Sequence, residues 1–177
     1  MNRIKFDIST IFNEYQKKDD LIALFKNDPK ALNKLIEFSL DHSNNKAWRA
    51  SLLLGHLMTK NDKQVIPYID KIIKILPQIT HDGHQRQLLI ILDKLTLNED
   101  QNGHLFNHCL TIWEDVNKIP STRIRSFRAM FKMTKNHPEL KDELRLFTTD
   151  YFTRTLSPGI KVSFQKIINK IGVTENQ

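Results

Sequence analysis

The fold is decided by residues 44–57, which read NNKAWRASLLLGHL. Four apolar residues in this stretch recur at the spacing i, i+3, i+4, i+7, which places them on one face of a helix. They are Ala50, Leu53, Leu54 and Leu57. Trp48 and Leu52 lie on another side of the same helix. Because such a helix must be covered on two sides, the stretch predicts a helix stacked between neighbours in an all-α fold.

The same helical spacing recurs along the rest of the chain. Seven further groups of four begin at Leu32, Ile69, Leu88, Phe106, Phe127, Leu144 and Phe164. Together with the group at Ala50, their first members follow one another at intervals of 17 to 21 residues. A leading group begins at Ile8, 24 residues before Leu32, and breaks this regularity. The pattern predicts a regular array of helices behind an irregular first element.

Proline and glycine mark the expected boundaries. Proline is tolerated at the first helical position, where its missing N–H costs nothing and its φ is preset. Five dipeptides fall where a helix is expected to begin: Asp28-Pro29, Ile66-Pro67, Ile119-Pro120, His137-Pro138 and Ser157-Pro158. Residues 80–83 and 98–103, which end in Gly83 and Gly103, are predicted to be turns.

Taken in pairs, the expected helices form a two-helix unit of 37 to 39 residues. One hairpin cannot bury its apolar face alone, so stacked hairpins share a continuous core. We therefore predict an all-α fold, an α-α superhelix (right-handed solenoid) of about four helical hairpins of 37–39 residues plus an N-terminal capping helix. A four-helix bundle is the alternative, but eight or nine helices exceed one bundle.

Length and composition favour one mostly helical domain. The chain has 177 residues, a length typical of one domain, and 40% of them are hydrophobic. Its five glycines are too few for a β fold rich in tight hairpins. We predict a single domain over residues 1–177, with 1–27 as an atypical N-terminal cap, 28–172 as repeats and 173–177 as a tail.

The cysteine content and the N-terminus bear on the compartment. Cys109 is the single cysteine, which excludes an intramolecular disulfide and fits a reducing compartment. The N-terminal MNRIKFDIST has no apolar stretch of signal-peptide length, and nowhere do 18 uncharged apolar residues run together. We expect a soluble, cytoplasmic protein that does not enter a membrane.

Three stretches carry a resemblance to a known family. They read NNKAWRASLLLGHL, HQRQLLIILDKL and RIRSFRAMFKM, the last followed by NHPELKDELR. Over about residues 28–172 their alternation resembles the HEAT-like or armadillo-type α-superhelical repeats of small bacterial proteins. Arg49, Arg86 and Arg125 come near the starts of their helices. The resemblance implies a scaffold that presents a concave surface to a protein or a nucleic acid.

The motifs of enzymatic and metal chemistry are missing or incomplete. The phosphate-binding patterns GxGxxG and GxxxxGK[ST] are absent. Cys109 lies within an apolar group and is predicted to be a packed core residue. His104 and His108 share a helix face, but two ligands do not make a metal site, and they are predicted to be surface or helix-end histidines. We expect no catalytic residue, no cofactor and no metal.

Positive charge gathers in the last third of the chain. The chain has 27 Lys and Arg against 20 Asp and Glu, and residues 120–177 hold 11 basic and 5 acidic groups. At 100° per residue, four basic side chains of the helix expected over 120–136 share an arc of about 80°. This basic stripe consists of Arg125, Arg128, Lys132 and Lys135, and Arg123 lies near it. A solvated face offset by Glu139, Asp142 and Glu143 is the alternative interpretation.

These observations predict a non-enzymatic scaffold or adaptor that binds another protein through its solenoid surface. The stripe is its candidate surface for an anionic partner. The alternative is a nucleic-acid-binding HEAT-like protein of the DNA repair type, with Lys161, Lys166 and Lys170 adding to the basic C-terminal third. HEAT-like DNA glycosylases use exposed aromatics with an aspartate, whereas Trp113 belongs to a core group and Asp115 to another face.

Overall fold

The computed structural model describes residues 8–13 and 18–172. All regular elements in these ranges are helical, which confirms the predicted all-α class. The chain divides into two compact units, Met1–Leu97 and Asn98–Gln177. Residues 1–7 and 14–17 of the predicted cap and the tail at 173–177 lie outside the described residues, and the single domain stays a prediction. Within the described ranges, no helix is long and apolar enough to cross a membrane.

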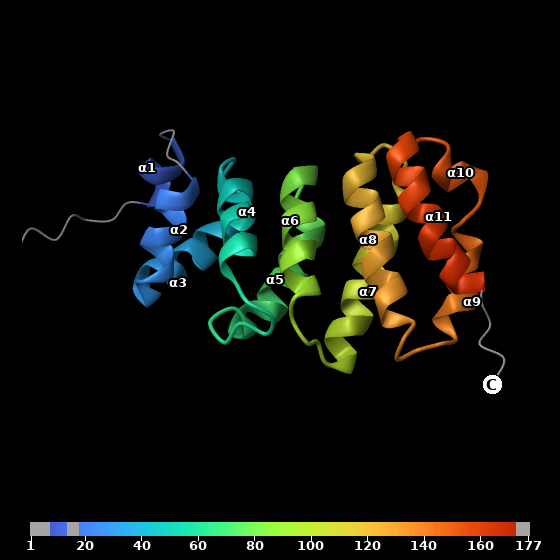
Figure 1. The fold of residues 1–177 in the computed structure, drawn as a ribbon, viewed down its shortest axis with the longest axis horizontal. Helices are drawn as coiled ribbons and strands as arrows, with labels where there is room; N and C mark the ends of the chain where they lie inside the picture. Colours follow the sequence, from blue (N-terminus) through green and yellow to red (C-terminus); the bar gives the residue numbers. More distant parts are fainter. Residues whose placement is uncertain (1–7, 14–17, 173–177) are drawn as a thin grey trace, which may run out of the picture. The chain divides into compact units, whose positions relative to one another are not determined.

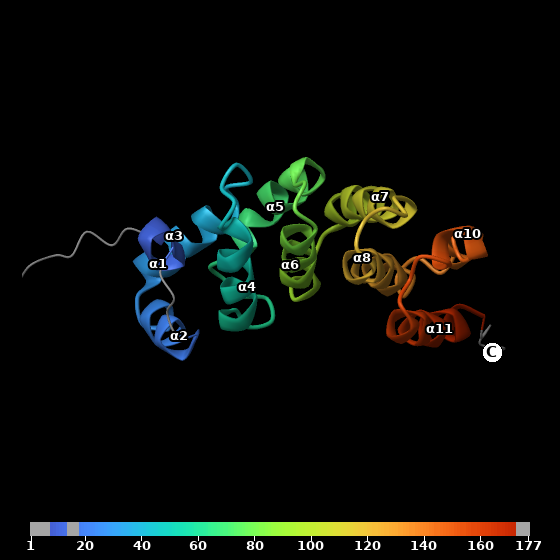
Figure 2. The ribbon, with the colours of Figure 1, turned by 90° about the horizontal axis from the view of Figure 1, so that it is seen from above.

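The first unit stacks its helices in two layers. Its helices are α1 (Ile8–Asn13), α2 (Lys18–Lys26), α3 (Pro29–Ser39), α4 (Ala47–Leu57), α5 (Ile69–Ile75) and α6 (Asp82–Asp93). Two 3-10 helices, η1 (Ile66–Tyr68) and η2 (Leu76–Gln78), flank α5. Figures 1 and 2 show α4 and α6 side by side in one layer and α5 in the other. The helix α4 contacts both α3 and α6, as predicted, but Leu52 of its second apolar side is 37% exposed.

The second unit repeats this two-layer plan. It holds α7 (Glu99–Glu114), α8 (Pro120–Met133), α9 (Leu140–Leu146), α10 (Asp150–Thr153) and α11 (Pro158–Gly172). In Figure 2, α8 and α11 lie in one layer and α7 and α10 in the other. Trp113, Phe127 and Phe164 join α7, α8 and α11 in an aromatic cluster with ring centroids 4.6 to 5.2 Å apart. Trp113 is fully buried, which confirms its predicted place in the core.

Proline marks three of the five helix starts as predicted, whereas Pro67 lies in the 3-10 helix η1 and Pro138 lies in a turn before α9. The helices α3, α8 and α11 begin at Pro29, Pro120 and Pro158. The Asp28 side chain caps α3 by accepting from the backbone N–H of the next two non-proline residues, at 2.9 and 3.2 Å. The helices α4, α6, α8 and α11 begin at residues 47, 82, 120 and 158, so the hairpin repeat is confirmed.

The turns predicted to end in Gly83 and Gly103 are wrong, because both glycines lie inside helices. Asn98 and Gln101 form a capping box that starts α7 before Gly103 is reached. The Asn98 side chain accepts from the Gln101 N–H at 2.8 Å, and the Gln101 side chain accepts from the Asn98 N–H at 3.1 Å. His81 caps α6 in a similar way, since its Nδ1 accepts from the N–H three residues on at 3.0 Å.

The helix expected from the group Leu144 to Tyr151 is interrupted. The helix α9 ends at Leu146, α10 begins at Asp150, and Tyr151 is 53% exposed instead of buried. Thr148 Oγ1 donates to the backbone carbonyl of Arg145 at 2.7 Å, and Thr149 adopts an extended conformation. Threonines that bond to nearby backbone compete with helix continuation, so they end this helix early.

Candidate interaction surface

In several hairpins, a buried polar side chain near the start of the second helix donates a hydrogen bond to a backbone carbonyl at the end of the first helix. The last carbonyls of a helix have no partner within it, so each needs an outside donor. Three donors meet this need: Ser51 Oγ bonds the Ser39 carbonyl at 3.1 Å, Gln85 Nε2 bonds the Leu76 carbonyl at 3.0 Å, and Arg123 Nη2 bonds the Trp113 carbonyl at 2.8 Å. We call these three side chains the hairpin latches. They hold the two helices of a repeat together at the end where α4, α6 and α8 begin.

Arg123 is a latch and does not belong to the basic surface, which corrects its predicted place. Its side chain is 0% exposed, and its guanidinium lies 4.7 Å from the centroid of the Trp113 ring. It also donates to the Phe152 carbonyl at 2.7 Å and to Thr155 Oγ1 at 2.8 Å. Burial lowers the pKa of this guanidinium, and the nearby Asp115 opposes that shift. The charge is thus held by carbonyl oxygens and an aromatic face.

The other stripe residues lie on the outer side of α8. Arg128, Lys132 and Lys135 are exposed and Arg125 is half-buried. The neighbouring helix α11 adds three exposed lysines, which are Lys161, Lys166 and Lys170. Neither Pro120–Met133 nor Pro158–Gly172 contains an acidic residue. We use the name basic face for these seven side chains of two neighbouring helices; at 100° per residue Lys161 lies on a different side of α11 from Lys166 and Lys170. Figure 2 shows the two helices in the same layer.

Acidic groups of this unit lie on other helices. Those in first helical turns are Glu99 and Asp100 of α7, Asp142 and Glu143 of α9, and Asp150 of α10. Two of the three carboxylates expected to offset the stripe have partners elsewhere. Asp142 pairs with Arg145 of its own helix, and Glu139 lies 3.5 Å from His137 Nδ1. Within this unit, α8 and α11 therefore carry basic residues without acidic ones, whereas α9 carries both.

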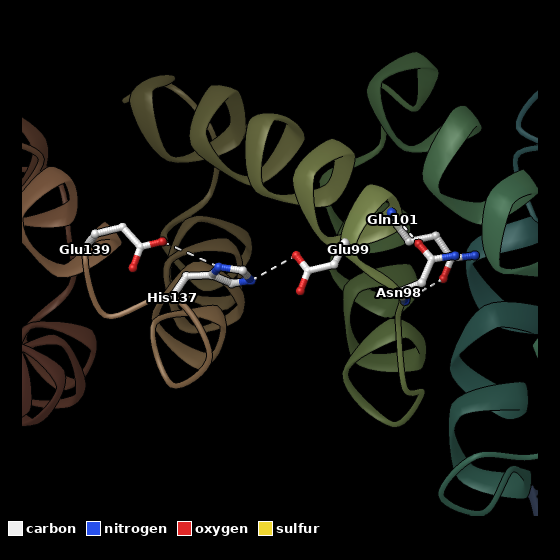
Figure 3. Close-up of polar contacts among 5 residues, drawn as sticks. All are labelled: Asn98, Glu99, Gln101, His137 and Glu139. Atoms are coloured by element: carbon white, nitrogen blue, oxygen red, sulfur yellow. Dashed lines mark hydrogen bonds and ion pairs between the residues drawn. The ribbon is translucent and has the colours of Figure 1, made fainter.

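A cleft of about 330 Å³ opens between α7, the end of α8 and the start of α9. Its lining includes the carboxylates of Glu99, Glu139 and Glu143. Figure 3 shows His137 between two of them, with Nε2 3.2 Å from Glu99 and Nδ1 3.5 Å from Glu139. We call it the acidic cleft. Sequence reasoning missed it because its residues come from separate helix ends, and Gly103, which also lines it, was expected in a turn.

The remaining sequence candidates have structural roles. His104 Nε2 lies 3.6 Å from Asp100, and burial together with His104 lowers the pKa of the half-buried His108. Among residues 8–13 and 18–172, no three His, Cys, Asp or Glu side chains are grouped as a metal ion would need. Cys109 is fully buried, as predicted, and burial raises the pKa of its thiol far above the ordinary value. A thiol held in its neutral form is a poor nucleophile.

The comparison with known families agrees with this repeating architecture. Residues 10–171 match the HEAT repeat domain family. The chain belongs to the HEAT repeat family. No curated protein and no solved structure gives a match. The HEAT repeat match spans nearly all of the described helices, so the latches and the basic face are features of its stacked HEAT hairpins.

Proposed function

We propose that this HEAT repeat protein is a non-enzymatic scaffold whose basic face binds an acidic surface of a partner protein. The observation that carries the proposal is the absence of acidic residues from two neighbouring helices, α8 and α11. These helices carry six of the seven basic side chains of the basic face, and Lys135 follows directly after α8. Charges on one face speed diffusional encounter and select partners of opposite charge. A cytoplasmic location belongs to the proposal and is supported by the lone, buried thiol of Cys109.

A rigid backbone would make this face effective. The basic side chains of α8 share a helix with Phe127 and Met130, which are fully buried, and with the Arg123 latch. Because the helix is anchored by its opposite side, its backbone does not have to become ordered on binding, and only the long basic side chains lose freedom. Exposed rim charges of this kind act more on the association rate than on the final affinity.

The test measures binding of a fluorescein-labelled glutamate-rich peptide by anisotropy. The variant Arg128→Glu with Lys132→Glu reverses two exposed charges of the basic face. Its matched control is Lys71→Glu with Lys74→Glu, which makes the same change on two exposed lysines of α5. We expect the first variant to weaken binding about tenfold or more, equal to about 1.4 kcal/mol, and the control to change it little. Equal losses in both variants would show attraction to net charge alone and would overturn the proposal.

Nucleic acid is the second candidate partner, favoured by the same acid-free pair of helices. Affinity for DNA or RNA would then fall steeply between about 50 and 200 mM salt, because bound phosphates release counterions. The outer side of α8 offers charge without stacking aromatics, since Phe127 is fully buried and Phe131 is half-buried. We would expect weak dependence on base sequence. Failure to retain labelled duplex DNA or single-stranded RNA at low salt would end this candidate.

A further inference from the structure

The acidic cleft combines an apolar floor with a negative rim. The apolar side chains of Phe106, Met133 and Leu140 contribute to its lining, and Phe106 is buried. Its volume of about 330 Å³ lies near the lower end of the range for ligand pockets, about 300 to 1,000 Å³. This space suits one or two side chains of a bound segment. The floor would accept hydrocarbon and the rim would accept a cation.

Charge decides which side chain fits. The cleft has three carboxylates in its lining and no lysine or arginine. The basic group there is His137, held between Glu99 and Glu139, and Glu143 adds a third exposed carboxylate. Lysine and arginine place a long hydrocarbon stem on apolar surface while their charged end reaches polar groups. Such a side chain matches both parts of the cleft, whereas an acidic segment would be repelled.

A glycine that no neighbour requires keeps this space open. Gly103 lies inside α7 and lines the cleft, and a Cβ added there would meet no atom within 4 Å. Glycine in a helix interior lowers stability relative to alanine, and here close packing gives no reason for it. Its effect is to leave room beside the helix backbone. This observation is independent of the charges on the rim.

We infer that the acidic cleft is a docking site for a basic segment of a partner protein. A lysine or arginine of that segment lies along Phe106 and Leu140 with its charged end among the three carboxylates. An aliphatic neighbour fills the space beside Gly103. This site uses α7, the end of α8 and the start of α9 and takes positive charge, whereas the basic face uses exposed side chains of α8 and α11 and takes negative charge. The protein would then have two docking sites of opposite sign in one unit.

The experiment uses the full chain and a fluorescein-labelled peptide in which arginine alternates with leucine. A second peptide with glutamate in place of each arginine is the negative probe. The variant Gly103→Leu fills the cleft, and Gly159→Leu is its matched control, because Gly159 also lies in a helix with nothing within 4 Å of an added Cβ. The pair Glu143→Gln and Glu114→Gln compares an exposed glutamate that lines the cleft with one of α7 that does not.

We expect Gly103→Leu to weaken arginine-peptide binding about tenfold or more while its thermal midpoint stays the same or rises. Glu143→Gln should weaken binding several-fold, and both control variants should bind like the wild type. Wild-type binding by Gly103→Leu, or equal binding of the glutamate peptide, would overturn the inference. Loss of binding in Glu114→Gln equal to that in Glu143→Gln would also overturn it, because total charge would then explain the effect.

Discussion

The two units close their hairpins at the same position with different chemistry. In the first unit the latches are neutral, Ser51 and Gln85, and His84 adds a contact to the Ser39 carbonyl at 2.8 Å. In the second unit one charged side chain, Arg123, makes four hydrogen bonds by itself. In these hairpins a side chain thus donates to a backbone carbonyl at the end of the preceding helix, but the type of residue that donates differs. The contacts that close the first unit consequently include an imidazole, His84, whereas the latch of the second unit is a guanidinium.

Removing the charged latch should have the largest effect. Arg123→Met leaves the Trp113 and Phe152 carbonyls and the Thr155 hydroxyl without this donor inside the unit. The Trp113 carbonyl is buried and the Phe152 carbonyl is partly buried, whereas Thr155 is exposed and its hydroxyl can bond to water. Because an unsatisfied buried polar group costs about 1–3 kcal/mol, we expect a loss of about 3 kcal/mol in the free energy of unfolding. Urea unfolding measures the loss, and hydrogen exchange should place it in residues 98–177.

The control for this change is Arg128→Met, which removes the same charge from an exposed position of the same helix. We expect a change within about 0.5 kcal/mol, as for ordinary surface substitutions. Arg123→Lys keeps the charge but cannot reach all three acceptors, so it should restore only part of the stability. Equal urea unfolding midpoints for Arg123→Met and Arg128→Met would contradict the role of Arg123 as a hairpin latch.

Acid should loosen the first unit at the contact that His84 makes. Burial lowers the pKa of His84 below its ordinary value of 6.5; the bond to Ser39 opposes this shift, and His81 and His42 add to it. The unfolded chain therefore binds a proton at a higher pH than the folded chain does. The stability contribution is complete above about pH 6.5 and is lost as the pH falls toward the lowered folded-state pKa. Hydrogen exchange at pH 7 and pH 5 should show increased opening of α3 and α6.

The matched pair for this measurement is His84→Gln and His56→Gln. His84 is 3% exposed, whereas His56 is an exposed residue of α4. We expect His84→Gln to flatten the dependence of the unfolding free energy on pH and His56→Gln to leave it as in the wild type. The same pH slope in all three proteins would rule out His84 as the source.

The neutral latch Gln85 should matter less than Arg123. Its Nε2 donates to the Leu76 carbonyl, but its buried Oε1 has no hydrogen-bond partner among the described residues. Gln85→Met loses one hydrogen bond and also removes the unsatisfied oxygen, so the two effects partly cancel. We expect a loss of about 1 kcal/mol in chemical denaturation. A loss as large as that of Arg123→Met would mean that the charge of the latch is unimportant.

The apolar spacing and the prolines predict most of the fold, because they report local helix geometry directly. They place α3, α8 and α11 at Pro29, Pro120 and Pro158. The same spacing could also have predicted that Arg123 is buried, since Arg123, Phe127 and Met130 follow the core spacing i, i+4, i+7. Its charge suggested a surface residue, but buried carbonyls outside its helix determine its place.

The acidic cleft was beyond such reasoning for a different reason. Glu99 lies 40 and 44 residues before Glu139 and Glu143 along the chain, and only the packing of α7 and α9 against α8 brings these carboxylates to one cleft. Helical spacing relates residues on one helix and does not predict which ends of different helices lie close together. The capping box at Asn98, which moves Gly103 from a turn into α7, is a short-range signal that the sequence does contain.

The smallest expected effects come from two glycines inside helices, one in each unit. A Cβ on Gly55 would contact Ile90 Cγ2 at 3.9 Å and Ile91 Cγ1 at 4.0 Å, whereas a Cβ on Gly103 would meet nothing within 4 Å. Both Gly→Ala changes should raise stability by about 0.5–1 kcal/mol through helix propensity. Gly55→Ala should gain slightly more, because its methyl group also packs against α6. A gain only for Gly103→Ala would show that α4 and α6 pack more closely at Gly55 than these distances indicate, and thermal unfolding of the two variants decides it.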